Sequence, residues 1–215
     1  MNLSVELESW LTTAPSPEGE PQVEAAKAAL RRAYSEPHRR YHGLDHITDC
    51  LGELSAVKGL DDPDRLMLAH ALWWHDVVYD PRRSDNETQS ARQAETDLAG
   101  LGYSGAHIAE VARLIVLTTG HRTDAGDRLG ALMVSIDLSI LGRPPEVYDA
   151  YAAAVREEYA HVPEPLFRAG RAQVMGRMLA AEPLFADEGF RNRFEAQARA
   201  NINREIAALS QGGPA

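Results

Sequence analysis

One apolar stretch, Leu66 to Asp80, constrains the fold of this chain more than any other. His75 and Asp76 stand side by side in a run otherwise rich in Leu, Ala, Trp and Val. Burying a carboxylate is costly unless a cation or hydrogen bonds compensate its charge. Any fold must therefore bring partners to this pair, and because imidazole and carboxylate are both common metal ligands, a metal site is the first interpretation.

The composition is that of a globular protein without disulfides. The chain has 215 residues, of which 44% are hydrophobic and 25% are charged, so it can bury a substantial core in one domain. The single cysteine, Cys50, forms no internal disulfide, and one thiol is too few for a cysteine-rich zinc site. We therefore expect histidines and carboxylates to hold any metal.

The charge balance excludes several classes of partner. A net charge of −10 disfavours binding to DNA, RNA or an anionic membrane, since those contacts depend on clustered Lys and Arg. The first residues show no basic stretch before an apolar segment, and no apolar run approaches the roughly 18 residues of a membrane span. We expect a cytoplasmic protein whose partner is a small molecule, neither a nucleic acid polymer nor a membrane, and the sequence leaves a homodimer open.

Helical periodicity recurs along the chain, and Pro and Gly separate the segments. The Pro-rich stretch 13–21 predicts a loop. The apolar run in 108–119 would also suit a strand, although its spacing favours a helix. The predicted helices cover 1–12, 23–34, about 43–57, 63–79, 87–98, 108–119, 128–141, 145–159, 165–181 and 190–209. We predict an all-α, single-domain helical bundle, with a metal-site core at about 38–142 and the C-terminal helices 145–209 packed on it.

Four residues are candidate metal ligands: His46, His75, Asp76 and Asp137. Asp137 is the only charged residue in the apolar stretch 129–141, so a buried helix would bury it as well. A lone His is more often a surface or hydrogen-bonded core residue than a ligand, but the other candidate ligands reverse that preference. Such a mixed nitrogen and oxygen set suits Mn²⁺, Fe²⁺, Co²⁺, Ni²⁺ or Zn²⁺, with Mg²⁺ as a further option, and it leaves positions open for water.

The ordered set resembles the HD superfamily of metal-dependent phosphohydrolases, in which a His, a His-Asp pair and a distant Asp lie on helices. Segments 41–47, 73–81, 85–91 and 137–142 are similar to a bacterial HD subfamily of predicted phosphohydrolases, as are 156–159, 167–171 and 198–201. The likeness therefore covers nearly the whole chain. It implies an HD-type bundle that binds one divalent metal ion through the four candidate ligands and cleaves a phosphate ester or anhydride with metal-activated water.

Further residues are candidates for the chemistry and for substrate binding. On a helix, Asp80 would lie one turn after Asp76 on the same face, where it could orient or deprotonate the water. Glu87 is a second candidate acid or base, although an acid also favours a helix start for electrostatic reasons. The candidate substrate contacts are Arg39, His42, Arg82, Arg83 and His121, since arginines bind phosphate by paired hydrogen bonds.

Two other functions stay open beside the phosphohydrolase. A two-iron HD oxygenase would need His107 or His121 as an additional ligand. A regulatory or ligand-binding module would keep the metal but have no turnover. Related hydrolases of guanosine alarmones have a Glu-Asp pair after the His-Asp pair, and this chain has Tyr79-Asp80 there, which argues against alarmone cleavage.

Overall fold

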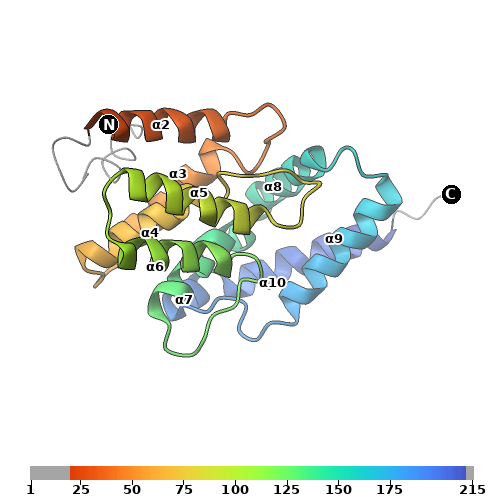
Figure 1. The fold of residues 1–215 in the computed structure, drawn as a ribbon. Helices are drawn as coiled ribbons and strands as arrows, with labels where there is room; N and C mark the ends of the chain where they lie inside the picture. The colour runs from red at the N-terminus through yellow and green to blue at the C-terminus, as the bar shows by residue number, and fades with distance from the viewer. Residues whose placement is uncertain (1–19, 212–215) are drawn as a thin grey trace.

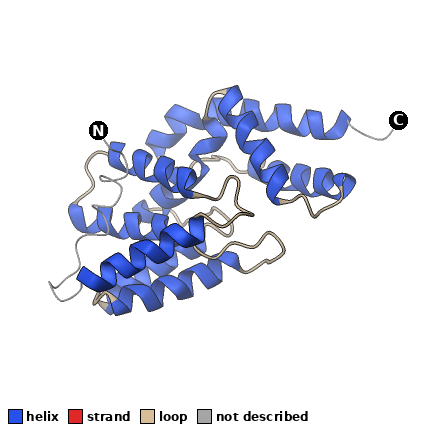
Figure 2. Ribbon diagram, turned by 90° about the horizontal axis from the view of Figure 1, so that it is seen from above, coloured by secondary structure: helices blue, strands red, loops and turns tan. Residues whose placement is uncertain are grey.

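The computed structural model describes residues 20–211, which form helices joined by loops and contain no strand (Figures 1 and 2). The elements follow one another as α2 (Glu20–Tyr34), α3 (Leu44–Ala56), α4 (Asp62–Trp74), α5 (Asn86–Gly100), α6 (Gly105–Leu117), α7 (Arg128–Asp137), the 3₁₀ helix η2 (Leu138–Gly142), α8 (Pro145–Glu158), α9 (Glu164–Leu179) and α10 (Glu188–Gln211). The predicted all-α class is confirmed, and the ambiguous segment 108–119 is largely helical.

The N-terminal predictions are tested only in part. The predicted helix 1–12 and most of the predicted loop 13–21 lie outside the described residues. The end of that loop is wrong, because α2 begins at Glu20 and includes Pro21. Proline is tolerated there because the first turn of a helix leaves its N–H groups without intrahelical partners.

Helix α4 forms the centre of the bundle. It contacts α3, α5, α6 and α7, and its residues from Leu68 to Trp74 are all buried. The Trp74 indole is fully enclosed, and its Nε1 donates to Asp97 Oδ2 of α5 at 2.9 Å. A helix that is apolar on every side must be covered on every side. The His75-Asp76 pair therefore lies at the end of the fully buried half of α4.

Helix α4 ends earlier than the sequence predicts. We expected it to continue to about residue 79, but it ends at Trp74, and His75 is its C-cap. The backbone beyond it is hydrogen-bonded by side chains from elsewhere: Arg39 donates to the carbonyls of Asp76 and Val77, and Ser90 Oγ accepts from the N–H of Val78. These partners replace the hydrogen bonds that would have continued the helix.

The C-terminal helices support the segment that follows Asp137. Helix α10 packs against both η2 and α9, and α8 also contacts η2. The buried Asn201 side chain of α10 donates to the carbonyls of Leu141 and Arg143. A Cβ at Gly142 would lie 2.4 Å from Phe194 Cβ, so this close approach of η2 and α10 requires glycine. The predicted division into a metal-site core and a C-terminal part stays a prediction.

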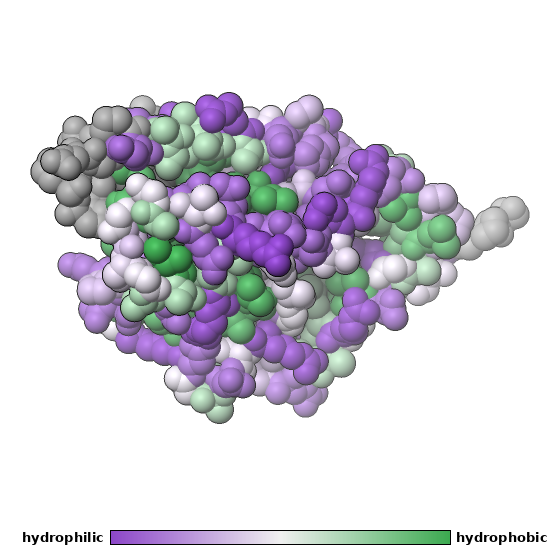
Figure 3. Space-filling view, viewed as in Figure 1, coloured by the Kyte–Doolittle hydropathy of each residue, from purple (hydrophilic) through white to green (hydrophobic). Residues whose placement is uncertain are grey.

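The described surface is polar with scattered apolar residues. Hydrophilic residues dominate the face in Figure 3, and the exposed large hydrophobic side chains of residues 20–211 are Val116, Val147 and Leu166, on three different helices. Within the same range, no helix combines the length and apolar character needed to cross a membrane.

Candidate metal centre

The fold brings the four predicted ligands together from distant parts of the chain. His46 lies in the first turn of α3, His75 caps the C-terminus of α4, Asp76 follows it, and Asp137 is the last residue of α7. The two imidazoles are almost fully buried, and each carboxylate side chain is only 14% exposed. The set is therefore an enclosed polar group inside an apolar bundle.

The spacing of the donor atoms fits ligands of one shared ion. His75 Nε2 lies 3.0 Å from Asp76 Oδ2 and 3.6 Å from Asp137 Oδ1. His46 Nε2 lies 3.1 Å from His75 Nε2, 3.3 Å from Asp137 Oδ1 and 3.8 Å from Asp76 Oδ2. Ligand atoms about 2.1 Å from an ion are separated by roughly 3.0–3.4 Å at octahedral or tetrahedral angles. The two histidine nitrogens lie at or near this spacing from each other and from both carboxylates.

The tautomer of His75 is set by its second ring nitrogen. His75 Nδ1 lies 2.9 Å from the Leu72 carbonyl oxygen, which can only accept a hydrogen bond, so Nδ1 carries the proton. In the neutral ring, the Nε2 lone pair then faces the two carboxylates. An imidazole held in this way through its outer nitrogen is the usual arrangement of a metal-binding histidine.

The electrostatics of the set favour positive charge at its centre. Burial alone would lower the pKa of His75, but the charge of Asp76 and hydrogen bonds to Asp137 and Asp76 outweigh it and raise that pKa well above its usual value. Burial would raise the pKa of both aspartates, yet the neighbouring histidines hold both pKa values below the usual range. Two ionised carboxylates in an enclosed site require cationic partners.

Cys50 is a candidate donor that the sequence reasoning set aside. It lies one turn after His46 on α3, with Sγ 3.7 Å from His46 Nδ1, and it is buried. Burial, followed by the charges of Asp137 and Asp76, raises the pKa of its thiol well above the usual value. In the described part of the chain, the groups of three donors that could hold an ion are His46–His75–Asp76 and His46–Cys50–Asp137.

His121 contacts one of the four predicted ligands His46, His75, Asp76 and Asp137, here called the donor set. It follows α6 in a loop, and its Nε2 lies 2.8 Å from Asp137 Oδ2, the carboxylate oxygen that does not face His46 and His75. Its φ of 50° is uncommon for a residue other than glycine, and such strain is typical of functional sites. The sequence proposed His121 as a substrate contact, and the structure places it where it orients Asp137.

Arg39 lies beside the site, but its guanidinium is fully engaged with the protein. Its side chain is 1% exposed and donates to Glu36 Oε2, to the His42 carbonyl, to the Asp76 carbonyl at 2.6 Å and to the Val77 carbonyl at 3.0 Å. We predicted a phosphate contact here, whereas these bonds make Arg39 a clamp on the turn that presents Asp76.

The clamp leads to a prediction for metal affinity. Arg39→Lys replaces a planar group that spans three carbonyls with a single ammonium, so the turn holding Asp76 loses part of its support. We expect metal affinity to fall roughly 10- to 100-fold, as for other residues that orient metal ligands. Competition with a chromogenic chelator measures this. Arg40→Lys, at an arginine 53% exposed, is the control; equal affinities in the two variants would contradict the clamp.

His42 is held by a buried carboxylate that was not among the predicted site residues. Glu158, at the end of α8, has a fully buried side chain, and its Oε1 accepts from the backbone N–H groups of Arg40, Tyr41 and His42 at 2.8, 2.8 and 3.0 Å. Its Oε2 lies 2.7 Å from His42 Nδ1 and accepts from the Tyr79 hydroxyl at 2.7 Å. His42 itself lies just before α3, which begins at Leu44. Glu158 therefore fixes the His42 ring.

Glu158 should make stability sensitive to acid. Burial would raise its pKa, but hydrogen bonds and charge from His42 and backbone donors lower it from 4.5 to about 2. Its contribution is therefore complete above about pH 4.5 and is lost as the pH falls towards 2. We expect wild type and Glu158→Gln to differ more in free energy of unfolding at pH 6 than at pH 3, measured with urea. An equal difference at both pH values would rule this out.

The reason given for Asp80 is wrong, although its role stays a prediction. Because α4 ends at Trp74, Asp80 does not lie one helical turn after Asp76. It stands in a loop, where its Oδ1 accepts from the backbone N–H of Arg82 at 2.9 Å and its own backbone bonds the Asn86 side chain. Glu87 lies partly buried in the first turn of α5, so its role as acid or base also stays a prediction.

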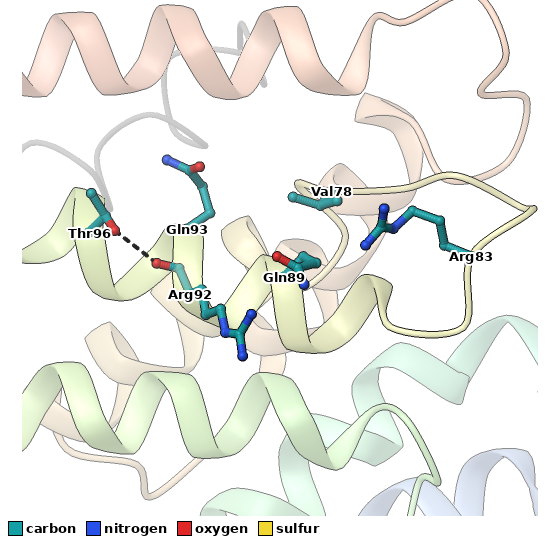
Figure 4. A pocket seen from close by; sticks show the side chains of 6 residues that line it. All are labelled: Val78, Arg83, Gln89, Arg92, Gln93 and Thr96. Atoms are coloured by element: carbon teal, nitrogen blue, oxygen red, sulfur yellow. Dashed lines mark hydrogen bonds between the residues drawn. The ribbon is translucent and has the colours of Figure 1, made fainter.

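The other predicted residues, Arg82, Arg83 and His107, have partners other than the four candidate ligands. Arg82 is 68% exposed, and Arg83 pairs with Asp85 at 2.7 Å. Figure 4 shows Arg83 at a polar cavity on the outer side of α5, together with Arg92. His107 Nε2 lies 2.9 Å from His70 Nδ1, so His107 belongs to a different histidine pair and not to the donor set.

No family model, curated protein or solved structure matches this chain. The all-helical fold and the buried His and Asp donors, a group that could hold a metal ion, are therefore the basis for any functional conclusion.

Proposed function

We propose that this chain is an HD-type, divalent-metal-dependent phosphohydrolase that cleaves a phosphate ester or anhydride of a small molecule such as a nucleotide. The observation that carries this proposal is the convergence of His46, His75, Asp76 and Asp137 in an enclosed site, where each histidine Nε2 lies 3.0–3.8 Å from an oxygen of both carboxylates and 3.1 Å from the other histidine. Their order along the chain is that of the HD superfamily, which the sequence resembles.

The donor chemistry fits a borderline divalent ion. Two imidazole nitrogens and two carboxylate oxygens suit Mn²⁺, Fe²⁺, Co²⁺, Ni²⁺ or Zn²⁺ better than Ca²⁺, which prefers oxygen ligands alone. Such an ion, when bound, acidifies a water molecule and offsets charge on phosphoryl oxygens. The protein supplies the fixed His75 tautomer and the carboxylates that attract the cation.

His42 is the side chain best placed to bind the phosphoryl group. Its ring is 23% exposed, stacks on Tyr79 at a centroid distance of 4.2 Å and lies 6.1 Å from the His46 ring. Burial would lower its pKa, but the hydrogen bond and charge of Glu158 raise it above the usual value. A protonated His42 held through Nδ1 would donate from Nε2 to a phosphate oxygen.

Asp80 and Glu87 remain the proposed acid or base, and paired variants separate them. Asp80→Asn and Glu87→Gln remove one ionisable group each without changing the donor set. Loss of a general base typically lowers kcat by roughly 10²- to 10⁴-fold. We expect one of the two variants to show this loss in a phosphate-release assay with unchanged metal content. Wild-type kcat in both would exclude both residues.

A screen of activities tests the proposal against its alternatives. The purified protein is supplied with Mn²⁺ and incubated with phosphomonoesters, nucleotides and diphosphates, with Asp76→Ala as control. Phosphate release that depends on Asp76 supports the proposal, and no release from any compound refutes it. Two irons per chain with oxygen consumption would indicate an oxygenase, for which His121, at 2.8 Å from Asp137 Oδ2, is the candidate additional ligand. Tight metabolite binding without turnover would indicate a regulatory module.

A further inference from the structure

A cavity of about 290 Å³ opens beside the donor set, between the loop after α6 and the last turns of α9. Residues 119–122 of the loop form one side, and Val174, Arg177 and Met178 of α9 form the other. Complete small-molecule sites usually measure about 300–1,000 Å³. This cavity is therefore of a size to hold part of a ligand.

The cavity is apolar inside and cationic at its mouth. Leu138 and Leu184 are buried in its wall, whereas the side chains of Arg122 and Arg177 are exposed. Within residues 20–211 neither guanidinium has an acidic or carbonyl partner. Two unpaired arginines at one opening are conspicuous in a chain of net charge −10.

Several other arginines of the described chain are held by carboxylates. Arg171 binds Glu205 at 2.9 Å, and Arg193 binds Glu53 at 2.8 Å. Arg177 also stands in the last turn of α9, where the helix dipole alone favours a cation. That explanation does not extend to Arg122, which belongs to a loop.

The cavity and the donor set share a wall. His121 lines the cavity, and its Nε2 contacts Asp137 Oδ2 at 2.8 Å. Leu138, which also lines it, is the next residue after Asp137. A ligand with its phosphoryl group at the donor set could therefore extend past His121 into the cavity.

We propose that this cavity, named here the Arg122–Arg177 subsite, selects substrates whose phosphoryl group is joined by an apolar spacer to a second anionic group. The leucines and Met178 contact the spacer, and the two arginines bind the distal anion. The inference rests on the proposed function for the phosphoryl end of the ligand. It adds a substrate class: phosphate compounds with a distal negative charge.

Three esters that differ only at their far end test the subsite. They are hexyl phosphate, its ω-carboxylate derivative and its ω-amine derivative, assayed by phosphate release from the Mn²⁺-loaded protein. We expect the carboxylate to have the lowest KM. Arg122→Gln and Arg177→Gln should each raise the KM of the carboxylate ester roughly tenfold, because each variant loses about one charge-assisted hydrogen bond to the ligand. Neither variant should change kcat or the KM of hexyl phosphate by much. Arg92→Gln, at an unpaired arginine of the Figure 4 cavity, should change none of these values.

A binding measurement separates the subsite from the reaction. Calorimetry measures the Kd of the non-hydrolysable phosphonate analogue of the carboxylate ester, for wild type and for the arginine variants. If wild type releases no phosphate but both arginine variants weaken phosphonate binding roughly tenfold, the subsite stands and the phosphohydrolase proposal fails. If the variants bind the phosphonate as tightly as wild type, or the amine ester is preferred, the subsite is refuted whatever the activity.

Discussion

Asp76→Ala is expected to lower kcat/KM for phosphate release by about 1,000-fold or more. A catalytic metal stabilises transition-state charge by several kcal/mol, and each 1.4 kcal/mol or so is a factor of ten in rate. The variant removes one of two carboxylates that attract the cation and leaves His75 Nε2 without its neighbour at 3.0 Å. Metal content and phosphate release, measured on the same sample, should fall together.

A matched control lies at the far end of α4, the helix that precedes Asp76. Asp62 is exposed in the first turn of α4, far along the helix from its C-cap, so Asp62→Ala changes one acid to alanine without touching the donor set. It should retain nearly full activity. Wild-type activity in Asp76→Ala, or an equal loss in both variants, would show that the donor set does not carry the reaction.

Glu158→Ala should have the largest effect on stability. One buried carboxylate accepts from three backbone N–H groups, from His42 and from the Tyr79 hydroxyl. Breaking such a buried charged network typically costs about 3–5 kcal/mol. For a domain of this size, that corresponds to a decrease in Tm of roughly 6–20 °C. Urea titration and thermal unfolding followed by circular dichroism measure both quantities.

The neighbouring residue is the control for this prediction. Glu157 is 66% exposed and pairs with Arg40 at 3.2 Å on the surface, an interaction worth at most about 1 kcal/mol. Glu157→Ala should therefore unfold within a few degrees of wild type. If Glu158→Ala were as stable as Glu157→Ala, the hydrogen bonds of Glu158 to the segment from Arg40 to His42 would not stabilise the fold as their geometry indicates.

Local periodicity was sufficient to predict most of the helices but not where α4 ends. The apolar spacing of α3 and α6 is a property of neighbouring residues, so the sequence shows it directly. The end of α4 depends on Arg39, which lies 37 residues before the carbonyl of Asp76. No local pattern shows that a distant guanidinium will donate hydrogen bonds to the carbonyls of Asp76 and Val77. For the same reason, the prediction that Asp80 lies one helical turn after Asp76 was wrong.

The sequence was sufficient to predict the candidate metal ligands but not the residues that hold the site in place. The His75-Asp76 pair and Asp137 stand out because they interrupt apolar stretches, His46 completes the ordered set, and the structure brings them together. Glu158 reads as one more acid in an amphipathic helix, since its contacts with Arg40 and His42 span 118 and 116 residues. The conformation of His121 likewise depends on Asp137, which lies 16 residues away.

Equilibrium dialysis followed by metal analysis tests most directly the claim that these four residues hold one divalent ion. Wild type is dialysed against Mn²⁺, Co²⁺ and Zn²⁺ in turn, beside His75→Gln, Asp137→Asn and the control Asp62→Ala. We expect one ion per chain in wild type and in the control, and much less than one in the other two variants. Substoichiometric metal in wild type, or one ion retained by His75→Gln and Asp137→Asn, would contradict the assignment.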